Sequence, residues 1–424
     1  MQLLPGFRDF YPADCARRNY ILDTWRTVCR RYGFVEYDGP VLEPIELYKK
    51  KSGGELVGQL FDFVDKGERH IALRPEMTPS LARMVAARAK DFRKPLKWFC
   101  VPQFFRYEKQ QRGRTREFYQ LNADIIGEPS PAADAELIAL VIDLLRAFGF
   151  TENDFVVRLS SRTAWENFFT TRGGNQEDEY TFFQIVDKAE RTANEKTEAL
   201  LSPFGISAGE VLTFMRSKEP VAGLAQVVSD LTSRGLDEFV EIDYAVVRGL
   251  AYYTGTVFEV FDRSKNERAL AGGGRYDNLL SLMSDGKTNL PALGVGMGDV
   301  VLANLIDDTP LAREKLEAAL AISRPCDVFV IVAKEELRGE ALKLVQALRD
   351  AGREVDYSLT PAKVGKQFQT AEQLGASLAV LVGDEWPQVK VKNLITREER
   401  LIPFESFRAE SPVLSGDPLS CPPE

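Results

Sequence analysis

The sequence predicts an α/β (more narrowly, α+β) protein in which an antiparallel sheet is flanked by helices and is followed by a separate α/β domain. Three observations lead to this prediction. The 424 residues exceed what one hydrophobic core usually supports. Strand-like segments on either side of a polar loop, near residues 96–127, indicate an antiparallel hairpin. After residue 325, strand and helix signals alternate, as they do in α/β domains.

The first elements follow from their patterns in order. Apolar residues at helical spacing predict a helix from Cys15 to Tyr32. "FVEYDGPVLEP" is typical of a strand interrupted by Pro40, because proline cannot donate to a sheet ladder. "HIALRPEMTPSLARMVAARAK" predicts a strand, a turn at Pro75 and a helix from about Thr78.

Further segments complete a first domain over residues 1–323. "PAADAELIALVIDLLRAFGF" predicts a helix, and residues 161–238 have mainly helical patterns, which indicate an insertion into the sheet domain. Strand signals return with "FVEIDYAVVRGLAYYTGTVFEVF". "RALAGGGRYDNLLSLM" and "LPALGVGMGDVVLANLI" each predict a strand, a glycine turn and a helix. Residues 324–408 predict a second, α/β domain, and the Pro/Ser-rich residues 409–424 predict a disordered tail.

Composition excludes several classes of protein. The chain has a net charge of −9, five cysteines without a C-x-x-C pair, and one histidine, His70. A single imidazole excludes most zinc and catalytic-triad sites, so we predict no metal site within the protein. We find no secretory signal and no apolar run of membrane-spanning length, and we expect a cytoplasmic protein without membrane contact.

The hairpin near residue 120 carries the strongest functional signal. Strand periodicity places Phe118, Gln120, Asn122 and Asp124 on one face, which suits a small polar ligand better than a core. Arg106 adds a planar cationic fork suited to phosphate or carboxylate. The connecting loop is basic and contributes Lys109, Arg112, Arg114 and Arg116.

These residues resemble the second signature motif of class II aminoacyl-tRNA synthetases, and "FRYEKQQRGRTREFYQ" resembles the histidyl-tRNA synthetase family in detail. "LPGFRDFYP", "RRYGFVEYDGPVLEP", "LRPEMTPSLAR", "RGLAYYTGTVFE" and "GGGRYD" match further family motifs in family order. The resemblance covers nearly the whole chain. It implies activation of L-histidine with ATP to histidyl-adenylate, transfer to the 3′ end of tRNA-His, and an anticodon-binding final domain.

The resemblance also implies roles for individual residues. Arg248 and Arg106 would be catalytic, because they would contact the carboxylate and the α-phosphate. The histidine-binding residues would be Glu76, Thr78, Arg106, Gln120, Asp124, Arg248, Tyr252 and Tyr253. The ATP-binding residues would be Arg106, Glu108, Arg114 and Phe118. ATP would be a substrate, and Mg²⁺ is expected with it. In the final domain, the phosphate contacts to tRNA would be Lys363, Lys366, Lys390 and Lys392.

The chain departs from the family at three positions. Ala251 stands where most members have aspartate, Asp124 where most have glutamate, and Val301 where most have an arginine that binds ATP. The helix and strand with Pro40 resemble the family's dimer interface, so the resemblance implies a homodimer through residues 15–45.

Two alternatives remain beside the ligase. The first is the synthetase-like regulatory subunit of ATP phosphoribosyltransferase, and the second is a non-catalytic tRNA-binding sensor. The regulatory paralogue normally lacks an anticodon-binding domain and has no reason to retain a basic ATP loop. The sequence has both features, which favours the ligase.

Overall fold

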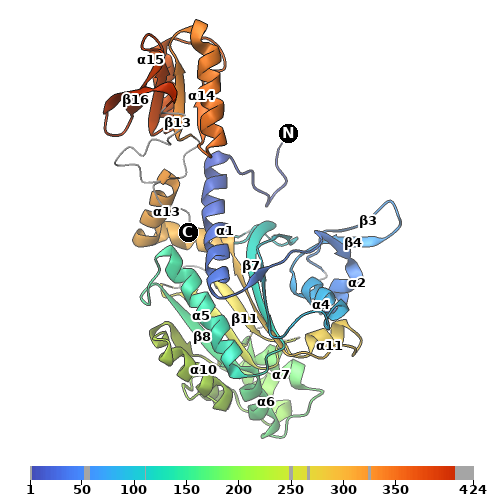
Figure 1. Ribbon diagram of the computed structural model, residues 1–424. Coiled ribbons are helices and arrows are strands. Elements are labelled where there is room, and N and C mark those ends of the chain that lie inside the picture. Colours follow the sequence, from blue (N-terminus) through green and yellow to red (C-terminus); the bar gives the residue numbers. More distant parts are fainter. Residues whose placement is uncertain are drawn as a thin grey trace. The chain divides into compact units, whose positions relative to one another are not determined.

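The computed structural model describes residues 2–51, 58–109, 111–247, 252–264, 268–322 and 326–405. The chain divides into two compact units, residues 1–317 and 318–424. The first unit contains a large, mostly antiparallel sheet with helices, and the second is a smaller α/β unit (Figure 1). The predicted fold class is therefore confirmed.

The large sheet has the order β1-β5-β7-β12-β11-β10-β8-β9 in the described part of the chain, and β6 extends the pairing of β7. Its strands are β1 (Val35–Glu36), β5 (Leu96–Cys100), β6 (Gln103–Phe105), β7 (Glu117–Ile126), β8 (Phe155–Ser161), β9 (Val240–Ile242), β10 (Thr256–Asp262), β11 (Ala271–Arg275) and β12 (Ala292–Gly298). The described pairings are antiparallel except β1 with β5 and β8 with β9. The predicted hairpin is formed by β5 and β6 against β7.

Three helices lie side by side on this sheet: α1 (Pro12–Arg31), α5 (Pro131–Phe148) and α10 (Ala222–Ser233) (Figure 1). Helix α5 begins with a proline, whose missing N–H needs no partner there. It ends at Gly149, which adopts a left-handed conformation with φ of 103°. Its inward residues are fully buried, so this layer forms much of the core of the first unit.

Residues after β8 form helices up to β9: α6 (Arg162–Thr170), α7 (Glu179–Val186), η1 (Ala189–Arg191), α8 (Asn194–Leu201), η2 (Ser202–Phe204), α9 (Ala208–Met215), α10 and η3 (Asp237–Phe239). Aromatic side chains hold this region together, because Trp165 lies against Phe168, Phe182 and Phe214. Ser207 and Glu210 form a capping box at the start of α9.

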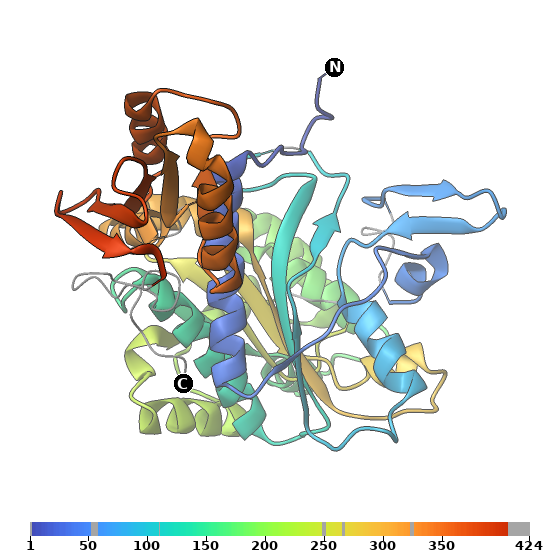
Figure 2. The same cartoon turned by 45° about the horizontal axis from the view of Figure 1, so that its top comes forward.

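A small antiparallel sheet lies beside the large one, with the order β2 (Leu42–Pro44), β4 (His70–Leu73), β3 (Asp62–Val64). Helices α2 (Ile45–Lys51), α4 (Thr78–Ala87) and α11 (Leu279–Met283) contact one another next to it (Figure 2). The first unit also contains α12 (Asp299–Asp308). The boundary between the units, after residue 317, falls within α13 (Pro310–Ile322). No helix among the described residues is long and apolar enough to cross a membrane.

Two predicted glycine turns are wrong. Gly272–Gly274 lie inside β11, and Gly294 and Gly296 lie inside β12. A Cβ atom at Gly273 would approach the backbone oxygen of Gly294 to 2.5 Å. These glycines therefore allow two strands and their neighbours to pack closely, whereas the sequence pattern indicated chain reversal. The strand signals over residues 239–261 fall in two strands, because β9 ends at Ile242 and β10 begins at Thr256.

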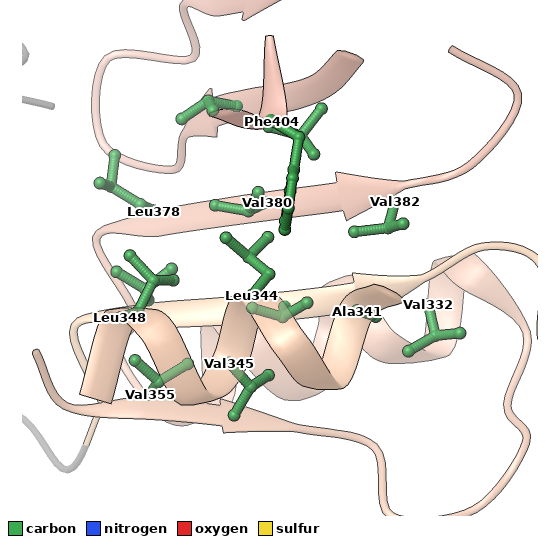
Figure 3. Packing of buried hydrophobic residues seen from close by; sticks show 14 residues of the cluster. Val332, Ala341, Leu344, Val345, Leu348, Val355, Leu378, Val380, Val382 and Phe404 are labelled. Carbon is green, nitrogen blue, oxygen red and sulfur yellow. The ribbon is translucent and has the colours of Figure 1, made fainter. Parts of the chain in front are cut away.

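The second unit has the sheet order β14 (Val355–Tyr357), β13 (Val328–Val332), β15 (Leu378–Val382), β16 (Gln388–Asn393), β17 (Glu399–Pro403). The first three strands are parallel, and the last two pair antiparallel. Its helices are η4 (Glu335–Leu337), α14 (Arg338–Asp350) and α15 (Val364–Gln373). Leu344 and Leu348 of α14 pack with Val380 and Phe404 in one of its two cores (Figure 3).

Candidate active site

A cavity of about 340 Å³ opens on the large sheet, and polar residues line most of it. Strand β7 contributes Gln120, Asn122 and Asp124, which alternate along the strand as the period-two pattern predicted. The other walls come from the turn before α4, from the residues before β10, and from β11 and β12. The lining residues there include Glu76, Thr78, Tyr252, Tyr253, Gly272, Tyr276, Gly294 and Gly296.

The glycines of β12 make room for the polar side chains of β7. An added Cβ atom at Gly294 would lie 2.0 Å from Oδ1 of Asp124, and one at Gly296 would lie 1.9 Å from Nε2 of Gln120. Strand pairing places Gly294 opposite Asp124, whereas Gly296 lies opposite Asn122, two residues along β7 from Gln120. Because the glycines have no side chains, the carboxylate and the amide can lie over the neighbouring strand. Nε2 of Gln120 also donates to Oδ1 of Asn122 over 3.2 Å.

Asp124 is buried and is held by a tyrosine. The hydroxyl of Tyr276 donates to its Oδ1. Burial, and next the nearby charge of Asp124, raise the pKa of Tyr276 well above its usual value, so the hydroxyl stays protonated and remains a donor. This contact fixes the orientation of the carboxylate, which can accept a further hydrogen bond from a ligand N–H.

Arg106 lies at the other side of this cavity. Its Nε donates to the backbone oxygen of Pro75 over 2.9 Å, which ties the guanidinium to the turn that carries Glu76. Burial lowers the pKa of Arg106, and Glu76 opposes that shift. A carboxylate and a guanidinium thus face one small space, a pattern suited to a ligand with both an ammonium and a carboxylate group.

A second cavity of about 180 Å³ adjoins the first, and Arg106 lines both. The β6–β7 hairpin contributes Glu108, Arg114 and Phe118, and the start of α12 contributes Val301. Arg114 forms an ion pair with the buried carboxylate of Glu108. This cavity combines an aromatic ring with cationic groups, which suits a nucleotide.

The N-terminal segment connects two walls of the second cavity. Arg8 forms ion pairs with Glu117 at 2.7 Å and with Asp299 at 3.0 Å, and both carboxylates are buried. Oδ1 of Asp299 also accepts from the backbone N–H of Tyr119 over 3.0 Å. Burial alone would lower the pKa of Arg8, but the two carboxylates raise it overall. The start of α12 is therefore held against β7.

The structure brings most of the sequence-predicted residues together. The larger cavity is lined by Glu76, Thr78, Arg106, Gln120, Asp124, Tyr252 and Tyr253, and the smaller one by Arg106, Glu108, Arg114 and Phe118. Arg248 and Ala251 lie outside the described residues. In the second unit, Lys363 and Lys366 are exposed at the start of α15. Lys390 and Lys392 are partly exposed on β16, where they pair with Glu385 and Glu399.

Sequence reasoning did not assign roles to Tyr276, Gly294, Gly296 or Arg268. Tyr276 could have been found from the "GGGRYD" motif, because it directly follows β11, two residues beyond Gly274. Its neighbour Arg275 is structural, because the guanidinium pairs with the buried Asp134 and donates to the backbone of Glu128 over 3.0 Å. No sequence pattern distinguished Tyr276, which lines the cavity, from the structural Arg275.

An antiparallel sheet whose arginine-bearing hairpin borders two adjoining polar cavities, followed by an α/β unit, is the arrangement of a class II aminoacyl-tRNA synthetase. Residues 6–298 match the family model described as histidyl-tRNA synthetase, and residues 327–410 match an anticodon binding domain. The chain belongs to the histidyl-tRNA synthetase family, and the predicted family, function and enzyme class are confirmed.

Relatives match over nearly the whole chain. The histidine–tRNA ligase of Opitutus terrae is 44% identical, over 96% of this chain and 97% of its own length. The chloroplastic/mitochondrial histidine–tRNA ligase of Arabidopsis thaliana is 38% identical, over 93% of this chain and 83% of its own. A solved histidyl-tRNA synthetase from Nostoc sp. PCC 7120 has the same fold, with a TM-score of 0.75 and 23% identity, and covers 96% of this chain and 98% of its own.

Proposed function

We propose that the protein activates L-histidine with ATP in the two adjoining cavities and then transfers the histidyl group to tRNA-His. One observation carries the assignment of the reaction centre. Arg106 lines both the larger cavity and the smaller cavity, which suits a nucleotide. A histidine carboxylate in the first and an α-phosphate in the second would therefore meet at one guanidinium.

Each side of the larger cavity suits a different part of histidine. Glu76 is the acceptor for the α-ammonium group, with Thr78 and Gln120 beside it. Asp124, oriented by Tyr276, accepts the imidazole N–H. Tyr252 and Tyr253 form an aromatic wall, with their ring centroids 4.5 Å apart. A site built from hydrogen-bonding groups rejects analogues that leave those groups unpaired, so this cavity provides selectivity for histidine.

The nucleotide occupies the smaller cavity. Phe118 stacks on adenine, and Glu108 and Arg114 hold the loop around the nucleotide. The histidine carboxylate attacks the α-phosphorus, the bond to the bridging oxygen breaks, and pyrophosphate leaves with its electron pair. Arg106 and Arg248 stabilise the charge that grows on the phosphoryl oxygens in the transition state. Mg²⁺ enters with ATP as part of the substrate.

The second unit binds tRNA-His through its anticodon. Lys392 lies 5.7 Å from the ring centre of Phe368 on α15, and Lys363 and Lys366 are exposed at the start of that helix. The four lysines thus lie on the side of the sheet that α15 covers. Ion pairs at the protein surface contribute little to stability, so phosphates can replace Glu385 and Glu399 as partners of these lysines.

The protein functions as a homodimer in the cytoplasm. Support for the dimer comes from the region 15–45, where β1 forms one edge of the large sheet and Val35, Val41 and Leu42 are exposed. Exposed apolar side chains on a sheet edge favour association. Sedimentation at micromolar concentration should give the mass of two chains, and the mass of one chain would contradict this assignment.

Histidine-dependent exchange of pyrophosphate into ATP tests the first step directly, and charging of tRNA-His tests the second. We expect both with the full chain. Arg106→Ala should reduce exchange by several orders of magnitude, because its guanidinium serves both cavities. A protein that binds histidine without exchange would instead be a regulatory subunit.

A further inference from the structure

Arg268 lies three residues before the start of β11 and lines the smaller cavity together with Ala269. Its side chain reaches the β6–β7 hairpin, where Nη2 donates to the side-chain oxygen of Gln111. Gln111 is a neutral amide, so this contact does not compensate the charge of the guanidinium. Arg268 is also exposed, which leaves it accessible to a ligand.

The other charges of this cavity already have partners. Arg114 pairs with Glu108, and Asp299 is held by Arg8. Arg106 also lines the larger cavity, beside Glu76. A triphosphate therefore needs a further cation beyond these groups.

Among the described residues, α12 contributes no cation to the wall of this cavity, because Asp299 is a carboxylate that Arg8 already holds and the next two residues are apolar. It contributes Val300 and Val301, and Val301 is only 8% exposed. A positive charge for the outer phosphates must then come from the hairpin or from the residues before β11. Among the described residues just before β11, Arg268 is the cation that lines this cavity.

We propose that Arg268 binds the β- or γ-phosphate of ATP and supplies the cation that α12 lacks at Val301. The guanidinium exchanges Gln111 for phosphate oxygens, to which its planar fork can donate two hydrogen bonds. The inference rests on the proposed use of this cavity for ATP. It adds a phosphate-binding residue from a segment to which the sequence motifs assigned no role.

Calorimetric titration of the full chain with ATP and with adenosine tests this proposal. Arg268→Ala should weaken ATP binding about 10- to 150-fold, as expected for losing hydrogen bonds to a charged group. Adenosine binding should stay within about twofold, because adenosine has no phosphate. In pyrophosphate exchange, the KM for ATP should rise while the KM for histidine stays constant. Equal weakening of ATP and adenosine, or no change in either, would overturn the assignment.

Two matched variants separate phosphate binding from other effects. Gln111→Ala removes the observed contact but retains the charge, so ATP affinity should be unchanged. If it reproduces the loss, Arg268 acts by holding the hairpin, and the proposal is wrong. Arg263→Ala removes another exposed arginine, which follows β10 and does not line the cavity. Its Nη2 donates to the backbone oxygen of Glu238 over 3.1 Å, and the substitution should leave the affinity for ATP unchanged. Absence of histidine-dependent exchange in the parent would contradict the proposed function, whereas the binding titrations would still test Arg268.

Discussion

Gly294→Ala should damage histidine binding through a single methyl group. The new Cβ atom would lie 2.0 Å from Oδ1 of Asp124 and 3.1 Å from the hydroxyl of Tyr276, whereas ordinary contacts begin near 3.4 Å. The carboxylate must therefore retreat by about 1.4 Å. Asp124 is short and is held by Tyr276, so this shift breaks that hydrogen bond and moves the acceptor away from the imidazole. A misplacement of about 1 Å can cost about 100-fold in rate.

The assay is histidine-dependent pyrophosphate exchange at saturating ATP. We expect the KM for histidine to rise at least about 100-fold, or about 2.7 kcal/mol. The KM for ATP should stay within about threefold, since Gly294 lines only the larger of the two cavities. Gly223→Ala is the matched control, because no atom lies within 4 Å of its added Cβ on α10. An unchanged KM for histidine in the folded variant would refute the role of Asp124.

Three other changes test neighbouring features. Asp124→Asn should raise the KM for histidine by about 10- to 100-fold in pyrophosphate exchange. Tyr276 can still donate to the remaining oxygen, so the amide N–H₂ would face the imidazole N–H, and two donors repel each other. The free energy of unfolding should fall above about pH 10, by about 1.4 kcal/mol per pH unit for each of Tyr48 and Tyr276. Burial raises the pKa of both tyrosines in the folded protein, so above about pH 10 they ionise only in the unfolded chain. Urea unfolding at pH 9 to 11 measures it, and a flat profile would contradict it. Replacing Lys390 and Lys392 by alanine should lower the slope of log affinity for tRNA-His against log salt by about 1.5, measured by filter binding.

Local patterns predicted the elements that a single periodicity defines. The alternation on β7 placed Gln120 and Asp124 in one cavity, because side chains of a strand alternate whatever surrounds it. The helix from about Thr78 begins at that residue, since proline at its second position favours a first turn. The clustering of Glu76 with Arg106 came from the family resemblance, since no periodicity connects residues in different elements.

Other features depend on partners that are remote in sequence. Gly294 and Gly296 indicated a turn, yet they lie in a central strand because side chains of β7 occupy their space. Strand β17 was not predicted, since "EERLIP" is charged and becomes a strand by pairing with β16 at the edge of the sheet. No sequence pattern pointed to Arg268, because its hydrogen bond to Gln111 forms only when β11 and the hairpin come together.

The position of the reaction centre follows from how these remote partners are held. Arg106 is tied to the turn at Pro75, and β7 is paired on both sides over residues 122–126. Arg8 then holds the start of α12 against the same strand through two buried carboxylates. Removing Arg8 would leave both buried carboxylates without the charge that compensates them, which would destabilise this arrangement. The walls of both cavities are thus fixed relative to β7, whereas the exposed Arg268 can exchange one partner for another. This division suits an enzyme that holds a small amino acid rigidly but must admit ATP and release pyrophosphate.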